Sequence, residues 1–291
     1  MTRRKNIKQL TSLLALGMLS NINELIALPD NGIKMPVLFI GHGSPMNALE
    51  DNLFTRGWKN VAKEIPLPKV ILFISAHWLT RGTYVSGVQH PNTIHDFGGF
   101  PKALFDVQYP APGFPELANE IITLYEGNVK LDQEWGLDHG VWSVAKPMYP
   151  NANVPCLQLS IDYSRPGEYH YTLAKRLRIL RNKGVLIIGS GNMVHNLGMV
   201  AFDKINEIGF GFDWALDINE TFKRNILEGN HVSLQKYESI HSASKKAIPT
   251  PDHYFPLLYS LALQDKNEKV ELFNDYAVGG SLTMTSVKIG G

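Results

Sequence analysis

Short apolar runs that end abruptly in small and polar residues recur along this chain. The runs at residues 37–40, 70–75 and 185–188 are rich in Val, Ile, Leu and Phe, and each passes directly into Gly, Ser, His or Asn. Continuous β-branched and aliphatic runs of this length are typical of strands buried on both faces of a parallel sheet. They therefore predict a central sheet with polar side chains at the carboxyl ends of its strands.

Segments with helical spacing of apolar residues lie between these strands. A fourth strand is expected over residues 154–161, and the tail SLTMTSVKI, which alternates apolar and polar residues, predicts a half-exposed antiparallel strand. Strands alternating with helices predict a single three-layer α/β/α domain with a largely parallel, mixed central sheet. Helices are expected from the first strand to about residue 63 and over residues 115–125, 168–183, 213–228, 233–244 and 253–263.

Two segments fall outside this pattern. Residues 80–114 are rich in Gly, Pro and aromatic residues, and so long a segment inside a domain predicts a functional loop or lid. Residues 1–30 form an N-terminal extension in which Arg3 and Arg4 precede a short apolar stretch, as in a twin-arginine export signal. The folded domain is expected over residues 35–291. We expect a cytoplasmic protein, with export as the alternative.

Composition narrows the possible partners to small molecules. The formal net charge is +1, and no basic cluster follows the N-terminus, so nucleic acid is not expected as a partner. No membrane partner is expected either, because the apolar stretch at residues 10–19 is too short to span a bilayer. Cys156 is the only cysteine, which excludes an intrachain disulfide and a thiolate-rich metal centre. Lying in an apolar run, it is expected to be buried and inert.

Four histidines stand beside the apolar runs. His42 occurs in VLFIGHGSP, His77 in VILFISAHW, His195 in VLIIGSGNMVHN and His253 in TPDHYFPLL. The first three follow predicted strands, so they are expected at the sheet edge where open α/β folds bind ligands. Because neutral histidine is a common ligand of transition metals, these residues predict a mononuclear metal site.

Longer motifs give a specific resemblance. The chain resembles the 4,5-DOPA dioxygenase branch of the class III extradiol ring-cleavage dioxygenases from about residue 35 to its C-terminus. The motifs that carry this resemblance are GHGSPMNALEDN, SAHWLTRGTYV, IHDFGGFPKALFDVQYPAPG, WGLDHGVWSVAKPMYP, GSGNMVHNL and TPDHYFPLLY.

The resemblance implies roles for five histidines. His42, His77 and His253 would be metal ligands, His195 either a further ligand or the catalytic acid/base, and His139 a second catalytic histidine. The wider class commonly binds Fe(II) with two histidines and one carboxylate. In this chain Asp252 stands beside His253, which leaves the third ligand and the metal open, since a histidine-rich site also suits Zn(II).

The implied reaction is the opening of a catechol ring, such as that of DOPA, with insertion of both atoms of O2. Two alternatives stay open: a zinc-dependent hydrolase, and a non-enzymatic Memo-type binding protein on the same fold. His95 is expected either to face the substrate or to form hydrogen bonds within the lid. The remaining histidines, which occur in polar or helical contexts, are expected at the surface: His90, His170, His231 and His241.

Overall fold

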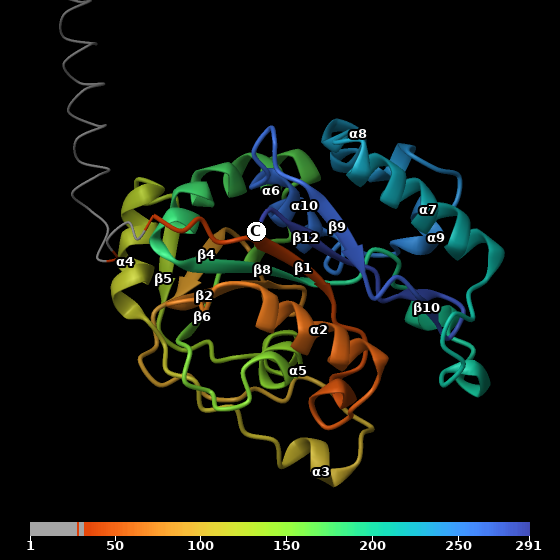
Figure 1. Ribbon diagram of the computed structural model, residues 1–291, viewed down its shortest axis with the longest axis horizontal. Coiled ribbons are helices and arrows are strands. Elements are labelled where there is room, and N and C mark those ends of the chain that lie inside the picture. Colours follow the sequence, from red (N-terminus) through yellow and green to blue (C-terminus); the bar gives the residue numbers. More distant parts are fainter. Residues whose placement is uncertain (1–27, 29–31) are drawn as a thin grey trace, which may run out of the picture.

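A six-stranded mixed sheet forms the centre of the computed structural model, which describes residues 28 and 32–291 (Figure 1). Four neighbouring strands run parallel in the order β6, β2, β8 and β1, and β12 lies antiparallel between β1 and β9. The strands of this sheet are β1 (Val37–Gly41), β2 (Val70–Ser75), β6 (Cys156–Gln158), β8 (Val185–Gly191), β9 (Val270–Phe273) and β12 (Ser286–Ile289). Except for residue 28, the N-terminal extension expected over residues 1–30 lies outside the described residues.

Shorter strands pair outside the central sheet. Both α-helices and 3-10 helices connect the strands. The paired short strands are β3 (Leu79–Thr80) with β7 (Ile161–Asp162), β4 (Thr83–Ser86) with β5 (Val129–Asp132), and β10 (Ala277–Val278) with β11 (Leu282–Thr283). The α-helices are α2 (Leu53–Glu64), α3 (Lys102–Phe105), α4 (Pro115–Leu124), α5 (His139–Met148), α6 (Gly167–Ala174), α7 (Asp213–Leu227), α8 (His231–Gln235), α9 (Ser244–Ala247) and α10 (Phe255–Ala262). The 3-10 helices are η1 (Pro45–Ala48), η2 (Lys175–Lys183), η3 (Leu197–Met199), η4 (Phe202–Lys204) and η5 (Tyr237–Ser239). Within the described residues, no helix has both the length and the apolar character needed to cross a bilayer.

Alternate residues of the buried strands pack against two different helix layers. On one face, Phe39 of β1 belongs to the same buried cluster as Leu257 of α10. On the other face, Leu38 joins a cluster with Trp58 of α2 and Trp142 of α5. Figure 1 shows α2 and α5 on one side of the sheet and α6 and α10 on the other. The predicted three-layer α/β/α fold with a mostly parallel sheet is therefore confirmed.

The helix α2 illustrates how local sequence builds these layers. Asn52 caps its first turn by accepting hydrogen bonds from the backbone N–H groups of Phe54 and Thr55, and the Thr55 side chain accepts from the backbone of Asn52 in return. Phe54, Trp58 and Val61 lie on one helical face and are buried against the sheet. Capping and an apolar stripe together fix the helix beside β1.

Several predicted helices differ from those observed. Residues 168–183 form α6 followed by η2, because the buried Leu177 and Leu180 repeat every three residues and the buried Arg181 hydrogen bonds to backbone carbonyls of other elements. Residues 233–244 do not form one helix but contribute to α8, η5 and α9, since the backbone of Lys236 leaves the helical region. Residues 253 and 254 precede α10, which begins at Phe255 with a proline in its first turn.

Several strands also depart from the prediction. Residues 154–161 contain β6 and the start of β7 rather than one strand. The tail is antiparallel as predicted, but its half-exposure is wrong, because β12 is paired on both edges and three of its four residues are buried. The sequence prediction omitted β5, β9 and α5. The long segment over residues 80–114 is mostly irregular, but it includes β4 and α3.

Arg181 closes the side of the sheet opposite to the strands' carboxyl ends. Its side chain is fully buried and donates to the carbonyl oxygens of Met35, just before β1, and Leu263, just after α10. Glu268 accepts two further hydrogen bonds from the guanidinium, at 2.6 and 2.8 Å. Partial burial acts to raise the pKa of Glu268, but the hydrogen bonds from Arg181 and Lys34 outweigh it and lower this pKa to about 2.

We predict that Glu268→Gln lowers the free energy of unfolding at pH 7 by about 3 kcal/mol, because a buried cation loses its counter-charge. A depressed carboxyl pKa contributes stability above its unfolded value and loses it as pH falls through the folded value. In urea denaturation, the free energy of unfolding of wild type should therefore fall as the pH is lowered from 4.5 to about 2, in part because Glu268 becomes protonated. The variant should lack this contribution of Glu268 to the pH dependence. The exposed Glu228→Gln is the control and should keep the wild-type profile.

Candidate metal centre

Three histidines from distant parts of the chain meet beside the carboxyl end of β8. His42 follows β1, and His77 lies two residues after β2; these strands flank β8 on its two sides. His253 lies in the turn before α10, and its carbonyl oxygen accepts a hydrogen bond of 2.9 Å from the backbone N–H of Asn192. A Cβ on Gly191 would stand 2.1 Å from that oxygen, so only glycine lets the turn approach β8.

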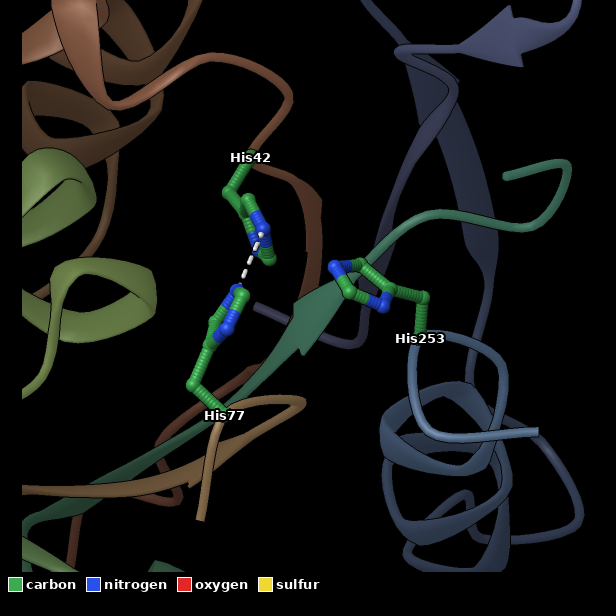
Figure 2. Close-up of side chains that lie close together, drawn as sticks. All are labelled: His42, His77 and His253. Atoms are coloured by element: carbon green, nitrogen blue, oxygen red, sulfur yellow. Dashed lines mark hydrogen bonds between the residues drawn. The ribbon is translucent and has the colours of Figure 1, made fainter. Parts of the chain in front are cut away.

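The three rings converge on one small volume. One nitrogen from each of His42, His77 and His253 lies within 4.8 Å of the other two, and the ring centroids are 5.0 to 5.2 Å apart. Figure 2 shows nitrogens of all three rings pointing toward a common space. His42 and His253 are almost fully buried, and the His77 side chain is 18% exposed. These groups are placed as ligands of a single cation would be.

Each of these rings has a partner at its outer nitrogen, Nδ1. His253 Nδ1 has a close hydrogen-bond contact with the Asp252 carboxylate, and His77 Nδ1 lies 3.4 Å from Asp96 Oδ2. His42 Nδ1 is 3.0 Å from the Ser190 hydroxyl oxygen. The hydrogen-bond partners of His42 and His253 favour a proton on Nδ1, which leaves the Nε2 lone pair free to bind a metal, and the nearby Asp96 carboxylate favours the same tautomer of His77.

The facing nitrogens of His42 and His77 leave a place for a cation between or beside them. The Nε2 atoms of His42 and His77 are 3.2 Å apart, the contact dashed in Figure 2. When both rings carry their proton on Nδ1, two lone pairs face each other at this distance, an arrangement that a bound cation stabilises. A proton is disfavoured there: burial first, and then the neighbouring histidines, lower the pKa of both His42 and His77 well below its usual value. The donor set therefore fits a divalent metal ion.

His195 stacks on the group of three and does not join it. Its ring lies parallel to that of His253, with 3.6 Å between the centroids. Burial and the adjacent His253 lower the pKa of His195 to about 3, so its ring is neutral at pH 7. A neutral imidazole beside the site can accept a hydrogen bond from a bound molecule.

His139 is the first residue of α5 and lies on the opposite side of the group. Its ring centroid is 3.8 Å from that of His77 and 5.7 Å from that of His42. Asp138 caps this helix by accepting from the Val141 N–H and from the Ser75 hydroxyl at the end of β2. Burial, together with the nearby charge of Asp96, raises the pKa of Asp138 to about 6.

Asp96 connects His139 with His77. One of its oxygens lies 2.9 Å from His139 Nδ1 and 3.0 Å from the His139 backbone nitrogen, while the other faces His77. His77, Asp96 and His139 therefore form a second group with metal-ligand spacing. In this second group, however, one carboxylate oxygen already accepts a hydrogen bond from the His139 backbone N–H. Although partial burial acts to raise the pKa of Asp96, the contacts with His139 outweigh it and lower that pKa, so Asp96 remains an anionic acceptor.

Aromatic side chains from the long 80–114 segment cover His139. The Phe97 ring meets the His139 ring edge-on at 5.6 Å and contacts Phe100 and Phe105 at 5.3 and 5.1 Å between centroids. His95 belongs to the same cluster, and its Nε2 lies 3.0 Å from the Val107 carbonyl oxygen, in agreement with a hydrogen-bonding role inside the segment. An aromatic wall thus borders one side of the site.

The other histidines are not part of this cluster. The surface position predicted for His170 is wrong: the side chain is fully buried, and its Nδ1 lies 3.0 Å from the Tyr259 hydroxyl. Its polar neighbours in the sequence concealed that it occupies the inner face of α6. His90 is exposed, and His231 and His241 are half-buried. Cys156 is buried as predicted, and burial raises its pKa to about 12.

Sequence inspection missed the residues that hold the rings. Asp96 and Ser190 were not singled out as partners of histidine, and Asp252 was noted only as a neighbour of His253. The motif HDFGGFP places Asp96 in the long segment, but nothing in its spacing indicates contact with His77 and His139. Ser190 reads as one small residue between two glycines.

Comparison with known proteins agrees with this geometry. The family model described as the catalytic LigB subunit of aromatic ring-opening dioxygenase matches residues 36–287. The chain belongs to this family. It is therefore an aromatic ring-opening dioxygenase. Membership of this family favours ring opening over the two alternatives from the sequence, a zinc-dependent hydrolase and a non-enzymatic Memo-type binding protein.

Named relatives span most of the chain. A 4,5-DOPA dioxygenase extradiol of Escherichia coli (strain K12) is 45% identical over 261 residues, which cover 88% of this chain and 95% of the relative. A protein with the same name from Beta vulgaris is 37% identical and covers 86% and 94%. The crystal structure of an uncharacterized protein from Escherichia coli K12 superposes with a TM-score of 0.77 at 40% identity, covering 88% of this chain and 100% of that one.

The close approach at Gly191 can be tested directly. We predict that Gly191→Ala costs about 1–3 kcal/mol in the free energy of unfolding, because the added methyl overlaps the His253 carbonyl oxygen and displaces the turn. The variant should also bind divalent metal more weakly, since His253 moves with the turn. Gly98→Ala is the matched control, because no atom lies within 4 Å of its Cβ position. The prediction would be contradicted if Gly191→Ala and Gly98→Ala had the same free energy of unfolding and the same affinity for divalent metal.

Proposed function

We propose that this dioxygenase opens the ring of a catechol such as DOPA, inserts both atoms of O2, and uses one metal ion bound by His42, His77 and His253. The observation that carries the proposal is the convergence of one nitrogen from each of His42, His77 and His253, while the Nδ1 atoms face Ser190, Asp96 and Asp252 outside the group. The relatives named 4,5-DOPA dioxygenase support the catechol as substrate. We assign the catalytic domain to residues 35–291.

The metal proposed for activity is Fe(II). When bound, Fe(II) supplies what the side chains cannot: a redox-active centre that brings a catechol and O2 together. Zn(II) suits the same three imidazoles but has no accessible redox change. Binding of Zn(II) therefore tests the ligand set, and oxygen consumption with Fe(II) tests the reaction.

His195 and His139 are proposed to move protons on opposite sides of the substrate. His195 lies beside the group of three with its ring stacked on that of His253, and we assign it the acceptance of a proton from a catechol hydroxyl as the substrate binds. His139 Nδ1 lies 2.9 Å from an oxygen of the Asp96 carboxylate, which orients the ring, and we assign His139 the donation of a proton later in the reaction. The stacking of His195 on His253, outside the group of three, favours the acid/base role over that of a fourth ligand.

The aromatic wall is proposed to position the substrate ring. Phe97 and Phe105 belong to the segment that also supplies Asp96, and Phe105 is 39% exposed. Aromatic pairs favour offset or edge-to-face contacts, so this wall can orient a catechol with its hydroxyls toward the histidines. It also limits water beside His139.

The ligand set predicts one metal per chain. Metal-free wild-type protein titrated with Zn(II) should bind one equivalent, whereas His42→Ala, His77→Ala and His253→Ala should each lose stoichiometric binding, since three ligands are the minimum for such sites. The exposed His90→Ala is the control and should bind like wild type. Full metal occupancy in any of the three variants would remove that residue from the ligand set. Binding of two equivalents of Zn(II) by wild type would indicate that the second group, which contains Asp96, also binds metal.

The reaction itself is tested by oxygen uptake. With Fe(II) under air, the protein should consume O2 and convert DOPA to a yellow ring-opened product, while the Zn(II) form should be inactive. His195→Gln and His139→Gln should each lower kcat by about 100-fold or more, the usual contribution of a positioned acid or base. Their Zn(II) affinities should stay near that of wild type, which separates proton transfer from ligation.

Two results would contradict this proposal. If the Fe(II) form left every member of a catechol panel intact, the substrate class would be wrong. If His195→Gln lost stoichiometric metal while His139→Gln kept it, His195 would be a ligand rather than the base.

A further inference from the structure

The Ser190 hydroxyl has only one possible arrangement of its hydrogen bonds. Ser190 lies in β8 and is fully buried, and its Oγ is 2.6 Å from the carbonyl oxygen of Gly140 and 3.0 Å from His42 Nδ1. A carbonyl oxygen cannot donate, so the single hydroxyl proton of Ser190 goes to Gly140. The hydroxyl oxygen therefore faces His42 as an acceptor, and His42 Nδ1 carries the proton.

This arrangement determines which nitrogen of His42 is free. With a proton on Nδ1, the neutral ring presents its Nε2 lone pair to His77 and His253. The opposite tautomer would place an N–H group against the metal position and leave the Ser190 oxygen without a donor. His42 is buried, so no solvent is at hand to compensate for the lost hydrogen bond.

The partner of His42 differs from those of the other two rings. Asp252 and Asp96 are carboxylates, whereas Ser190 is neutral. A hydroxyl fixes the tautomer without adding a third negative charge to a site that already has two. A carboxylate would also lack the proton that binds Gly140.

Ser190 also links His42 to the helix that carries His139. Gly140 belongs to the first turn of α5, next to His139, and Ser75 of the neighbouring strand donates to Asp138 in the same turn. Ser75 and Ser190 are register partners on β2 and β8. The ends of β2 and β8 thus hold the start of α5 through Ser75 and Ser190. Of these two serines, only Ser190 also contacts the ring of a proposed ligand, His42.

We propose that Ser190 is a positioning residue: it fixes the Nδ1–H tautomer of His42 and holds His42 and His139 at their mutual distance by bonding to Gly140. The inference rests on the proposed function for the role of His42 as a ligand. The tautomer itself is a property of the metal-free protein, and it can be measured whether or not the enzyme turns over.

The direct measurement is long-range 1H–15N NMR of metal-free protein labelled at histidine nitrogens, at pH 8, with the His42 signals identified by their loss in His42→Gln. Wild type should show Nδ1 protonated and Nε2 unprotonated. Ser190→Ala should lose this pure tautomer, and its affinity for Zn(II) should fall by about 10–100-fold, the usual effect of removing a hydrogen-bond partner of a ligand. Ser190→Thr, which retains a hydroxyl, should restore both properties.

Ser260→Ala is the matched control. Ser260 is another fully buried serine, and its hydroxyl lies 2.9 Å from the Leu38 carbonyl oxygen, away from every histidine ring of the site. This variant should keep the tautomer and Zn(II) affinity of wild type. If Ser190→Ala does not fold, Ser190→Cys replaces it, because a thiol has a similar shape but is a weak acceptor.

Three outcomes separate the possibilities. Nε2–H on His42 in wild type would overturn the inference at once. An unchanged tautomer and Zn(II) affinity in Ser190→Ala or Ser190→Cys would overturn the positioning role. A wild-type Nδ1–H that is lost in Ser190→Ala, seen in a protein that binds Zn(II) but opens no catechol, would support the inference while contradicting the proposed function.

Discussion

Close packing of imidazole rings inside a protein favours tautomers whose protons lie on the nitrogens that face away from the other rings. His42, His77 and His253 meet this preference through an acceptor at each Nδ1. The acceptors come from a strand, a long loop and a turn, so the charge balance of the site depends on three separate parts of the fold. Burial then lowers the pKa of His42 and His77, which prevents protons from occupying the space between the rings.

The sheet brings these parts together because its parallel strands end at one edge. β1 and β2 flank β8, and their carboxyl ends deliver His42, His77 and Ser190 to nearly the same level. Gly191 then allows the turn that contains His253 to cross over β8 at backbone contact distance. On the opposite edge, Arg181 ties the start of β1 to the end of α10. The contact at Gly191 holds the turn that contains His253, and Arg181 holds the start of β1 and the end of α10. Both contacts therefore help to fix the positions of His42, which follows β1, and His253, which precedes α10.

Much of this arrangement could be predicted from the sequence, for a clear physical reason. Buried parallel strands are continuous apolar runs, so β1, β2 and β8 and the histidines after them were visible, and long motifs supplied His139 and His253. β5 and β9 were missed because they are short and carry charged residues, and α5 because it contains Gly140 and Pro147. The roles of Asp96 and Ser190 depend on contacts between residues far apart in the chain, which no local pattern encodes.

The place of β12 has a consequence for how the enzyme is made. This strand is inserted between β1 and β9, although β1 is the first strand of the sheet along the chain and β12 the last. Just before it, Met284 packs against Gly41 and Gly43 on either side of His42. During synthesis β1 therefore has an unpaired edge until residues 286–289 have left the ribosome, and the loop around His42 lacks its packing partner for as long. The loop around His42 therefore reaches its final packing only when the strand farthest from it along the sheet's chain order has joined β1.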